Sequence, residues 1–183
     1  SNKSDYSVAD FTDAMDLAIT SNALSLIKAV MQENFCSITN LLNIRNIIEH
    51  YVLLLMDESG DISDTQKELF NEQYKLIEYK LYKDNKLILT GTVIDPEQME
   101  ENYLSAKSVF VKHGFSESNV KAFLRTRVPF LCDKDFNFNS SIKKYCPDFE
   151  DAYIYLSRRI HPSTYYEPVN IKYVQSVIMV IVF

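Results

Sequence analysis

Glycine, proline and tryptophan are scarce in this chain of 183 residues, which contains 3 Gly, 5 Pro and no Trp. Turn-rich β folds draw heavily on glycine and proline, so their scarcity argues against such folds. It also argues against a glycine-rich loop that holds phosphate groups. The apolar run at Val177–Phe183 is far too short to cross a bilayer, so we expect no membrane span.

The net charge and the number of cysteines further limit the function and the cellular compartment that we expect for this protein. The formal net charge is −6, so no overall field attracts nucleic acid, and RNA binding would need a local basic patch. Cys36, Cys132 and Cys146 are odd in number and lack metal spacing, which favours small core residues in a reducing cytoplasm. There is no signal peptide pattern.

No His, Cys or carboxylate set has zinc spacing, so we expect neither a metal ion nor a cofactor. The chain begins with Ser1, not Met, which leaves open whether native flanking sequence is missing.

What the chain does have is apolar residues at helical spacing along most of its length. We predict a single all-α domain over residues 1–183, a helical bundle of about six or seven helices. The expected helices span about 7–34, 38–57, 63–83, 96–113, 116–128, 148–160 and 169–183. Ser21-Asn22 is a candidate joint in the first helix, and residues 85–94 read as a short hairpin or an extended connection. Residues 132–141 are expected to be a loop, followed by a turn of helix at 141–145.

Capping residues in the sequence predict where three helix ends lie. Ser63 with Gln66 three residues later is typical of a capping box. Asp95 followed by Pro96 is an N-cap residue with proline at the first helical position. Gly114 is expected to end the helix that Pro96 begins.

The stretch from Ile44 to Met56, IRNIIEHYVLLLM, combines apolar and ionisable residues. The apolar side of this helix is expected to contain Ile44, Ile47, Ile48, Tyr51, Leu54 and Leu55. Arg45 and Glu49 lie one turn apart and can pair, and Asn46 and His50 are also one turn apart. Because an isolated buried charge is too costly, Arg45 and Glu49 form either a structural ion pair or the floor of a polar cleft.

Arg45-Asn46-x-x-x-His50 is similar to the Arg-x4-His motif of the HEPN superfamily, small helical proteins that include metal-independent ribonucleases and toxin–antitoxin components. The resemblance implies that His50 acts as general acid or base on a ribose hydroxyl. Arg45 would stabilise the charge that gathers on the phosphate.

A second polar stretch, Tyr153–Tyr166, ends in an expected break at His161, because the following Pro162 disfavours helical geometry. Ser157 and His161 are four residues apart, and Arg158 and Arg159 fall in the last helical turn, where cations are favoured. Together these residues could bind an anion such as phosphate. The alternative is a capped helix end with a solvated basic face.

Taken together, the two stretches resemble an uncharacterised bacterial family of helical proteins, a domain of unknown function. The resemblance rests on Arg45 with Glu49 and on Leu156-Ser157 with His161-Pro162-Ser163. It implies a fold and a polar cluster of Arg45, Glu49 and His161, and it implies no activity.

Two functional classes therefore stay open for a bacterial cytoplasmic protein. One is a HEPN-like ribonuclease of a defence or toxin–antitoxin system, with Arg45, Glu49, His50 and His161 as its catalytic group. Its partner would be RNA or another phosphate-bearing ligand, bound with the help of Asn46, Ser157, Arg158 and Arg159, and its cleft could lie across a homodimer interface. The other is a non-enzymatic ligand-binding or protein-interaction module with a buried Arg45–Glu49–His161 cluster.

Overall fold

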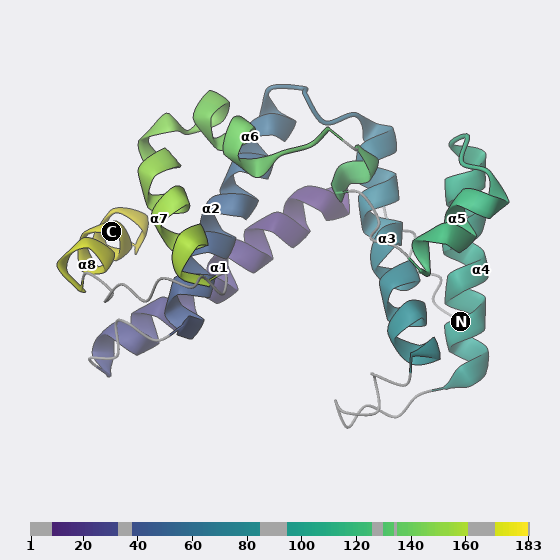
Figure 1. Ribbon diagram of the computed structural model, residues 1–183, viewed down its shortest axis with the longest axis horizontal. Helices are drawn as coiled ribbons and strands as arrows, with labels where there is room; N and C mark the ends of the chain where they lie inside the picture. The colour runs from purple at the N-terminus through teal and green to yellow at the C-terminus, as the bar shows by residue number, and fades with distance from the viewer. Residues whose placement is uncertain are drawn as a thin grey trace. The chain divides into compact units, whose positions relative to one another are not determined.

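The computed structural model describes residues 9–32, 38–84, 95–125, 130–133, 135–160 and 171–182. These residues form eight α-helices and two short 3₁₀ helices, and none of them lies in a β-strand (Figure 1). The predicted all-α class is confirmed, with one α-helix more than the expected six or seven. The hairpin or extended connection expected at 85–94 lies outside the described residues.

The α-helices are α1 (Ala9–Met31), α2 (Ile38–Glu58), α3 (Asp64–Lys83), α4 (Pro96–Lys112), α5 (Glu117–Phe123), α6 (Phe138–Tyr145), α7 (Glu150–Ile160) and α8 (Ile171–Val182). The 3₁₀ helices are η2 (Phe130–Cys132) and η3 (Pro147–Phe149). No helix in the described ranges is both long and apolar enough to span a bilayer.

The joint expected at Ser21-Asn22 was wrong, because α1 continues through it without a break. Polar side chains in this part of α1 bond back to the helix's own carbonyls. Asn22 Nδ2 donates to the Ala18 oxygen at 2.7 Å, and Ser25 Oγ donates to the Ser21 oxygen at 3.0 Å. These bonds satisfy the polar groups without an exit from helical geometry.

Two further expected boundaries were wrong. The loop expected over 132–141 gives way to α6 at Phe138, because Asn137 is an N-cap whose side chain accepts from Asn139 N at 2.8 Å. The helix expected to reach residue 128 has its last α-helical residue at Phe123. There the amide of Arg125 bonds three residues back, to the Ala122 oxygen at 2.9 Å, which tightens the last turn.

The predicted helix caps are confirmed. Ser63 and Gln66 form the capping box of α3, with Gln66 N donating to Ser63 Oγ at 3.2 Å and Ser63 N donating to Gln66 Oε1 at 3.0 Å. Asp95 caps α4 ahead of Pro96. Gly114 ends that helix with φ +90°, while the next amide, Phe115 N, bonds back to the Phe110 oxygen at 3.0 Å. Glycine adopts this left-handed conformation without the penalty of a Cβ atom.

The helices gather into two compact units. The first unit spans 1–11 and 62–136, and in it α3 and α4 run antiparallel, side by side, with α5 against α4 (Figure 1). Its buried core consists of Leu69, Leu76, Tyr79, Tyr103, Ala106, Phe110 and Val120.

The second unit spans 12–61 and 137–183 and contains the candidate site. Its core is built around α2, against which α6 and α7 pack, with further side chains from α1 and α8. That core consists of Leu26, Leu41, Ile44, Ile47, Ile48, Val52, Ile142, Cys146, Ala152, Tyr153, Leu156, Val174 and Ile178. The single-domain prediction stays a prediction.

Candidate functional site

The helix α2 carries most of the candidate site. Its apolar face is buried in the core of the second unit. Ile44, Ile47 and Ile48 are buried, as their spacing predicted. Tyr51 was also expected to face inward, but it is exposed and packs edge-to-face on Phe149, with ring centroids 6.3 Å apart. A tyrosine can bury one edge of its ring and keep its hydroxyl in water, which explains this difference.

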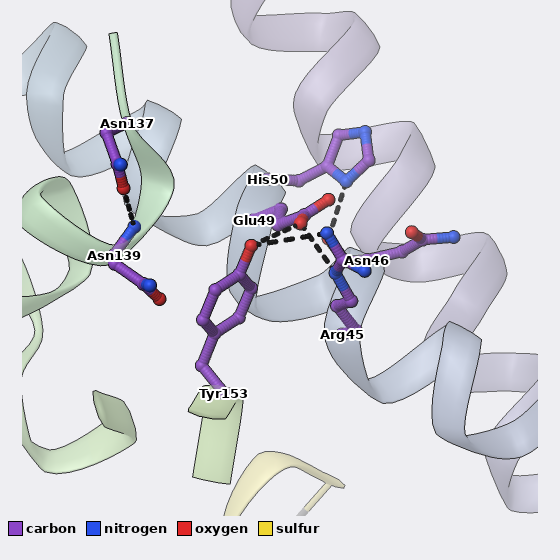
Figure 2. A network of polar contacts seen from close by, with 7 residues as sticks. All are labelled: Arg45, Asn46, Glu49, His50, Asn137, Asn139 and Tyr153. Carbon is purple, nitrogen blue, oxygen red and sulfur yellow. Dashed lines mark hydrogen bonds and ion pairs between the residues drawn. The ribbon is translucent and has the colours of Figure 1, made fainter. Parts of the chain in front are cut away.

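Arg45, Glu49 and Tyr153 form a closed hydrogen-bonded group, the triad, between α2 and α7 (Figure 2). Arg45 Nε donates to Glu49 Oε1 at 2.8 Å, and the Tyr153 hydroxyl donates to the same oxygen at 2.7 Å. Arg45 Nη2 donates in turn to the Tyr153 hydroxyl at 3.4 Å. The predicted pairing of Arg45 with Glu49 is therefore present, and Tyr153 is its third member.

The triad is sheltered from water on most sides. The side chains of Arg45 and Glu49 are 20% and 17% exposed, and Tyr153 as a whole is only 5% exposed. Arg45 also lies over the face of Tyr153, with Cζ 5.4 Å from the ring centroid, a favourable cation–π position. Tyr153 thus holds Arg45 both through its hydroxyl and through its ring.

Burial and the hydrogen bonds within the triad determine the protonation states of its residues. Burial, with the hydrogen bond to Glu49, raises the pKa of Tyr153 to about 12, so its hydroxyl keeps its proton at neutral pH. Burial tends to lower the pKa of Arg45, but the hydrogen bond and charge of Glu49 outweigh it and the pKa is raised. A neutral tyrosine and a permanently charged arginine are poor proton carriers at neutral pH.

His50 stands apart from the triad on the same helix. Its Nδ1 lies 2.6 Å from the backbone oxygen of Asn46, one turn earlier, so the expected neighbours meet through a carbonyl (Figure 2). A carbonyl oxygen only accepts, so Nδ1 carries a proton, and in the neutral ring Nε2 has the lone pair. Arg45 and His50 are five residues apart and diverge on a helix, which separates the two residues of the HEPN-like motif.

The late polar stretch is described as far as Ile160, so the expected His161 lies outside the described residues. Its other members, Ser157, Arg158 and Arg159, have different surroundings on α7. Arg158 is exposed, whereas Arg159 stacks over the ring of Tyr155 with Cζ 4.9 Å from the centroid. The hydroxyl of Ser157 is buried and meets no hydrogen-bond partner among the described residues. Their joint role in binding an anion stays a prediction.

Sequence reasoning named both α2 members of the triad and missed Tyr153 as their partner. Tyr153 lies on the buried side of α7 together with Ala152 and Leu156. The signal that could have identified Tyr153 is its type, because a buried tyrosine hydroxyl needs a polar partner. The expected third member was His161, and its position relative to Arg45 stays a prediction.

The thiols in the described ranges are Cys132 and Cys146, and both are free. Burial raises the pKa of Cys132 to about 11 and, together with the charge of Asp148, also raises the pKa of Cys146. Thiols held in the protonated form are poor nucleophiles and poor metal ligands. Within the described ranges, no group of three His, Cys, Asp or Glu side chains is placed to hold a metal ion.

Comparisons of the chain with known protein families, with curated proteins and with solved structures found no match. The resemblances to the HEPN superfamily and to a bacterial family of helical proteins therefore stay expectations from sequence. The function has to be argued from the geometry alone.

Proposed function

We propose that this chain is a non-enzymatic protein-interaction module in which the triad is a structural staple between α2 and α7. The observation that carries the proposal is the mutual hydrogen bonding of Arg45, Glu49 and Tyr153, at 2.7 to 3.4 Å. A charge that is already paired and sheltered is costly to separate from its partner, so it offers little to a ligand.

The charges of the triad argue against a phosphate site at Arg45. Glu49 lies against Arg45 with 2.8 Å between Nε and Oε1, so an incoming phosphate would face a carboxylate. It would also have to displace two hydrogen bonds to Glu49 Oε1, one from Arg45 and one from the Tyr153 hydroxyl. Charged hydrogen bonds of this kind contribute about 1.5–3 kcal/mol each, which an anion would need to replace.

Bacterial cytoplasmic residence belongs to the same proposal. The free thiols of Cys132 and Cys146 support it, because unpaired cysteines are usual in reducing compartments. A disulfide found by mass spectrometry in chain purified under native conditions, with free thiols blocked at lysis, would argue for an oxidising compartment instead.

A double-mutant cycle tests the staple. Glu49→Ala, Tyr153→Phe and the double variant are unfolded in urea, and a coupling of about 1 kcal/mol between the two sites is expected. Both single changes should destabilise the fold. Catalytic groups are held at a cost to stability, so their removal is often neutral or stabilising. Zero coupling, or a gain in stability in either variant, would contradict the staple.

His50 supports a second candidate, the HEPN-like ribonuclease. Its Nδ1 is bound to the Asn46 oxygen, and its Nε2 meets no hydrogen-bond partner among the described residues. A neutral imidazole fixed in this tautomer is suited to accept a proton from a ribose hydroxyl. Arg45 would have to leave Glu49 to take part, or another cation would have to replace it.

Cleavage of a mixed single-stranded RNA in the presence of a chelator separates the two candidates. The proteins are the wild type, His50→Ala and, as a matched control, His113→Ala, which changes the residue that follows α4. We expect no cleavage by any of them. Chelator-resistant cleavage that is lost in His50→Ala and kept in His113→Ala would instead establish the ribonuclease.

A further inference from the structure

The helix α1 has apolar side chains on two opposite faces. Phe11, Met15 and Leu26 on one face are buried. The other face carries Leu17, Leu24, Ile27 and Met31, which are 71%, 61%, 38% and 81% exposed. At about 100° per residue these four lie within an arc of about 80°, roughly opposite the buried face. We call them the apolar stripe.

The spacing of the apolar stripe is that of a two-helix seam. Leu17, Leu24 and Met31 repeat every seven residues, and Ile27 follows Leu24 by three, which matches the a and d positions of a heptad. Single exposed leucines are ordinary on protein surfaces, but four large apolar side chains exposed on one face of a helix indicate an interaction site. The shape that fits such a stripe is another amphipathic helix.

The charges on α1 are segregated along its length. Asp13 and Asp16 lie in the first half, whereas Lys28 is the only charged residue between Leu17 and Met31. A parallel copy of α1 would set Asp13, which falls at a d position, against Asp13, and it would place no acidic residue of the partner beside Lys28. An antiparallel copy brings the Lys28 end of one helix to the Asp13 end of the other. The charge pattern therefore complements a second α1 in one orientation.

We infer that two copies of this chain associate through α1, with the apolar stripes packed antiparallel and Lys28 of each copy beside Asp13 of the other. The inference rests on the proposed interaction function and gives it a partner and a surface. A two-fold symmetric pairing of this kind is the commonest form of homo-oligomer.

The molar mass in solution tests the apolar stripe. Sedimentation velocity over a range of concentrations should show a dimer of the wild type. Leu24→Asp should weaken the dimer by about 100-fold or more, because the symmetric pairing buries two new carboxylates. Leu104→Asp is the matched control, since Leu104 on α4 is 52% exposed and lies outside the apolar stripe. It should leave the dimer intact.

Charge reversal tests the orientation. Lys28→Asp should weaken the dimer by about 3- to 10-fold, because it sets the introduced carboxylate of one copy against Asp13 of the other. Adding Asp13→Lys to the same chain restores an opposite-charge pair only when the helices are antiparallel. A double variant that dimerises no better than Lys28→Asp would overturn the antiparallel arrangement.

The remaining outcomes also separate the two proposals. A monomeric wild type whose stability falls in Leu24→Asp would mean that the chain covers the apolar stripe itself, and it would overturn the dimer. A dimer that survives Leu24→Asp would overturn α1 as its surface. Neither outcome touches the triad, whose test is the coupling between Glu49 and Tyr153. The staple and the dimer can therefore fail independently.

Discussion

Each of the two units holds a polar cluster that joins two helices, and the clusters differ in how much water reaches them. In the second unit the triad joins α2 to α7 around Tyr153, which is buried. In the first unit Glu68 of α3 accepts from His113 Nε2 at 2.6 Å and from Lys112 Nζ at 3.1 Å, and we call these three the surface cluster.

Both clusters pair a carboxylate with a basic side chain, Arg45 in the triad and Lys112 in the surface cluster, so residue type alone does not distinguish them. The side chain of Glu49 is 17% exposed and that of Glu68 is 34% exposed. Ion pairs that water reaches contribute little, whereas sheltered ones become costly to break. The difference indicates that breaking the triad destabilises its unit and that breaking the surface cluster costs much less.

The largest expected effect comes from removing the carboxylate at the centre of the triad. Glu49→Ala should lower the free energy of unfolding by about 2–3 kcal/mol, because it leaves Arg45 and the Tyr153 hydroxyl without their shared acceptor. The matched change in the surface cluster, Glu68→Ala, should cost less than about 1 kcal/mol. Urea unfolding followed by circular dichroism measures both, and equal losses would remove the proposed difference between the clusters.

A smaller effect is expected when only the hydroxyl of Tyr153 is removed. Tyr153→Phe keeps the ring under Arg45 and loses the bond to Glu49, which should cost about 1–1.5 kcal/mol. Tyr51→Phe is the control on α2, because Tyr51 is exposed and lies outside the triad. If both variants lost the same stability, the cost would come from a tyrosine hydroxyl in general and not from the triad.

The contribution of Tyr153 should also depend on pH. Its pKa is raised to about 12 in the folded chain by burial and by the bond to Glu49, against about 10 for an unfolded tyrosine. The folded state therefore holds this proton more tightly, and stability falls as pH rises through that window. The gap between wild type and Tyr153→Phe should be full at pH 9 and shrink toward pH 12. A gap that stays constant in urea unfolding across this range would contradict the raised pKa.

Local signals in the sequence predicted most of the helices. The capping residues Ser63, Asp95 and Gly114 act within one turn of chain, so their roles can be predicted without knowledge of the fold. The start of α6 was missed because Asn137 suits both a loop and an N-cap, and the choice depends on burying Ile142 against the second-unit core. This boundary depends on distant packing, which no local signal in the sequence supplies.

The residues of the candidate site also differ in whether local sequence signals predict them. Arg45 and Glu49 are one helical turn apart, so their pairing could be predicted from spacing. Tyr153 lies 104 residues after Glu49, and no local rule connects the two positions. The exposed stripe of α1 was also missed, because Leu17 and Leu24 have the same residue type and periodicity as core positions. Only their exposure in the folded chain distinguishes them.

The smallest expected effect concerns the surface cluster at low pH. The hydrogen bond from His113 and the contacts with Lys112 lower the pKa of Glu68 despite partial burial. This contribution is present above the ordinary pKa of glutamate and is lost as pH falls through the lowered value. The stability gap between wild type and Glu68→Gln should therefore shrink between pH 6 and pH 3, and 1 M NaCl at pH 6 should shrink it too, because exposed charges are screened. If salt left that gap unchanged, water would not reach Glu68 as freely as its exposure indicates, and the surface cluster would behave like the triad.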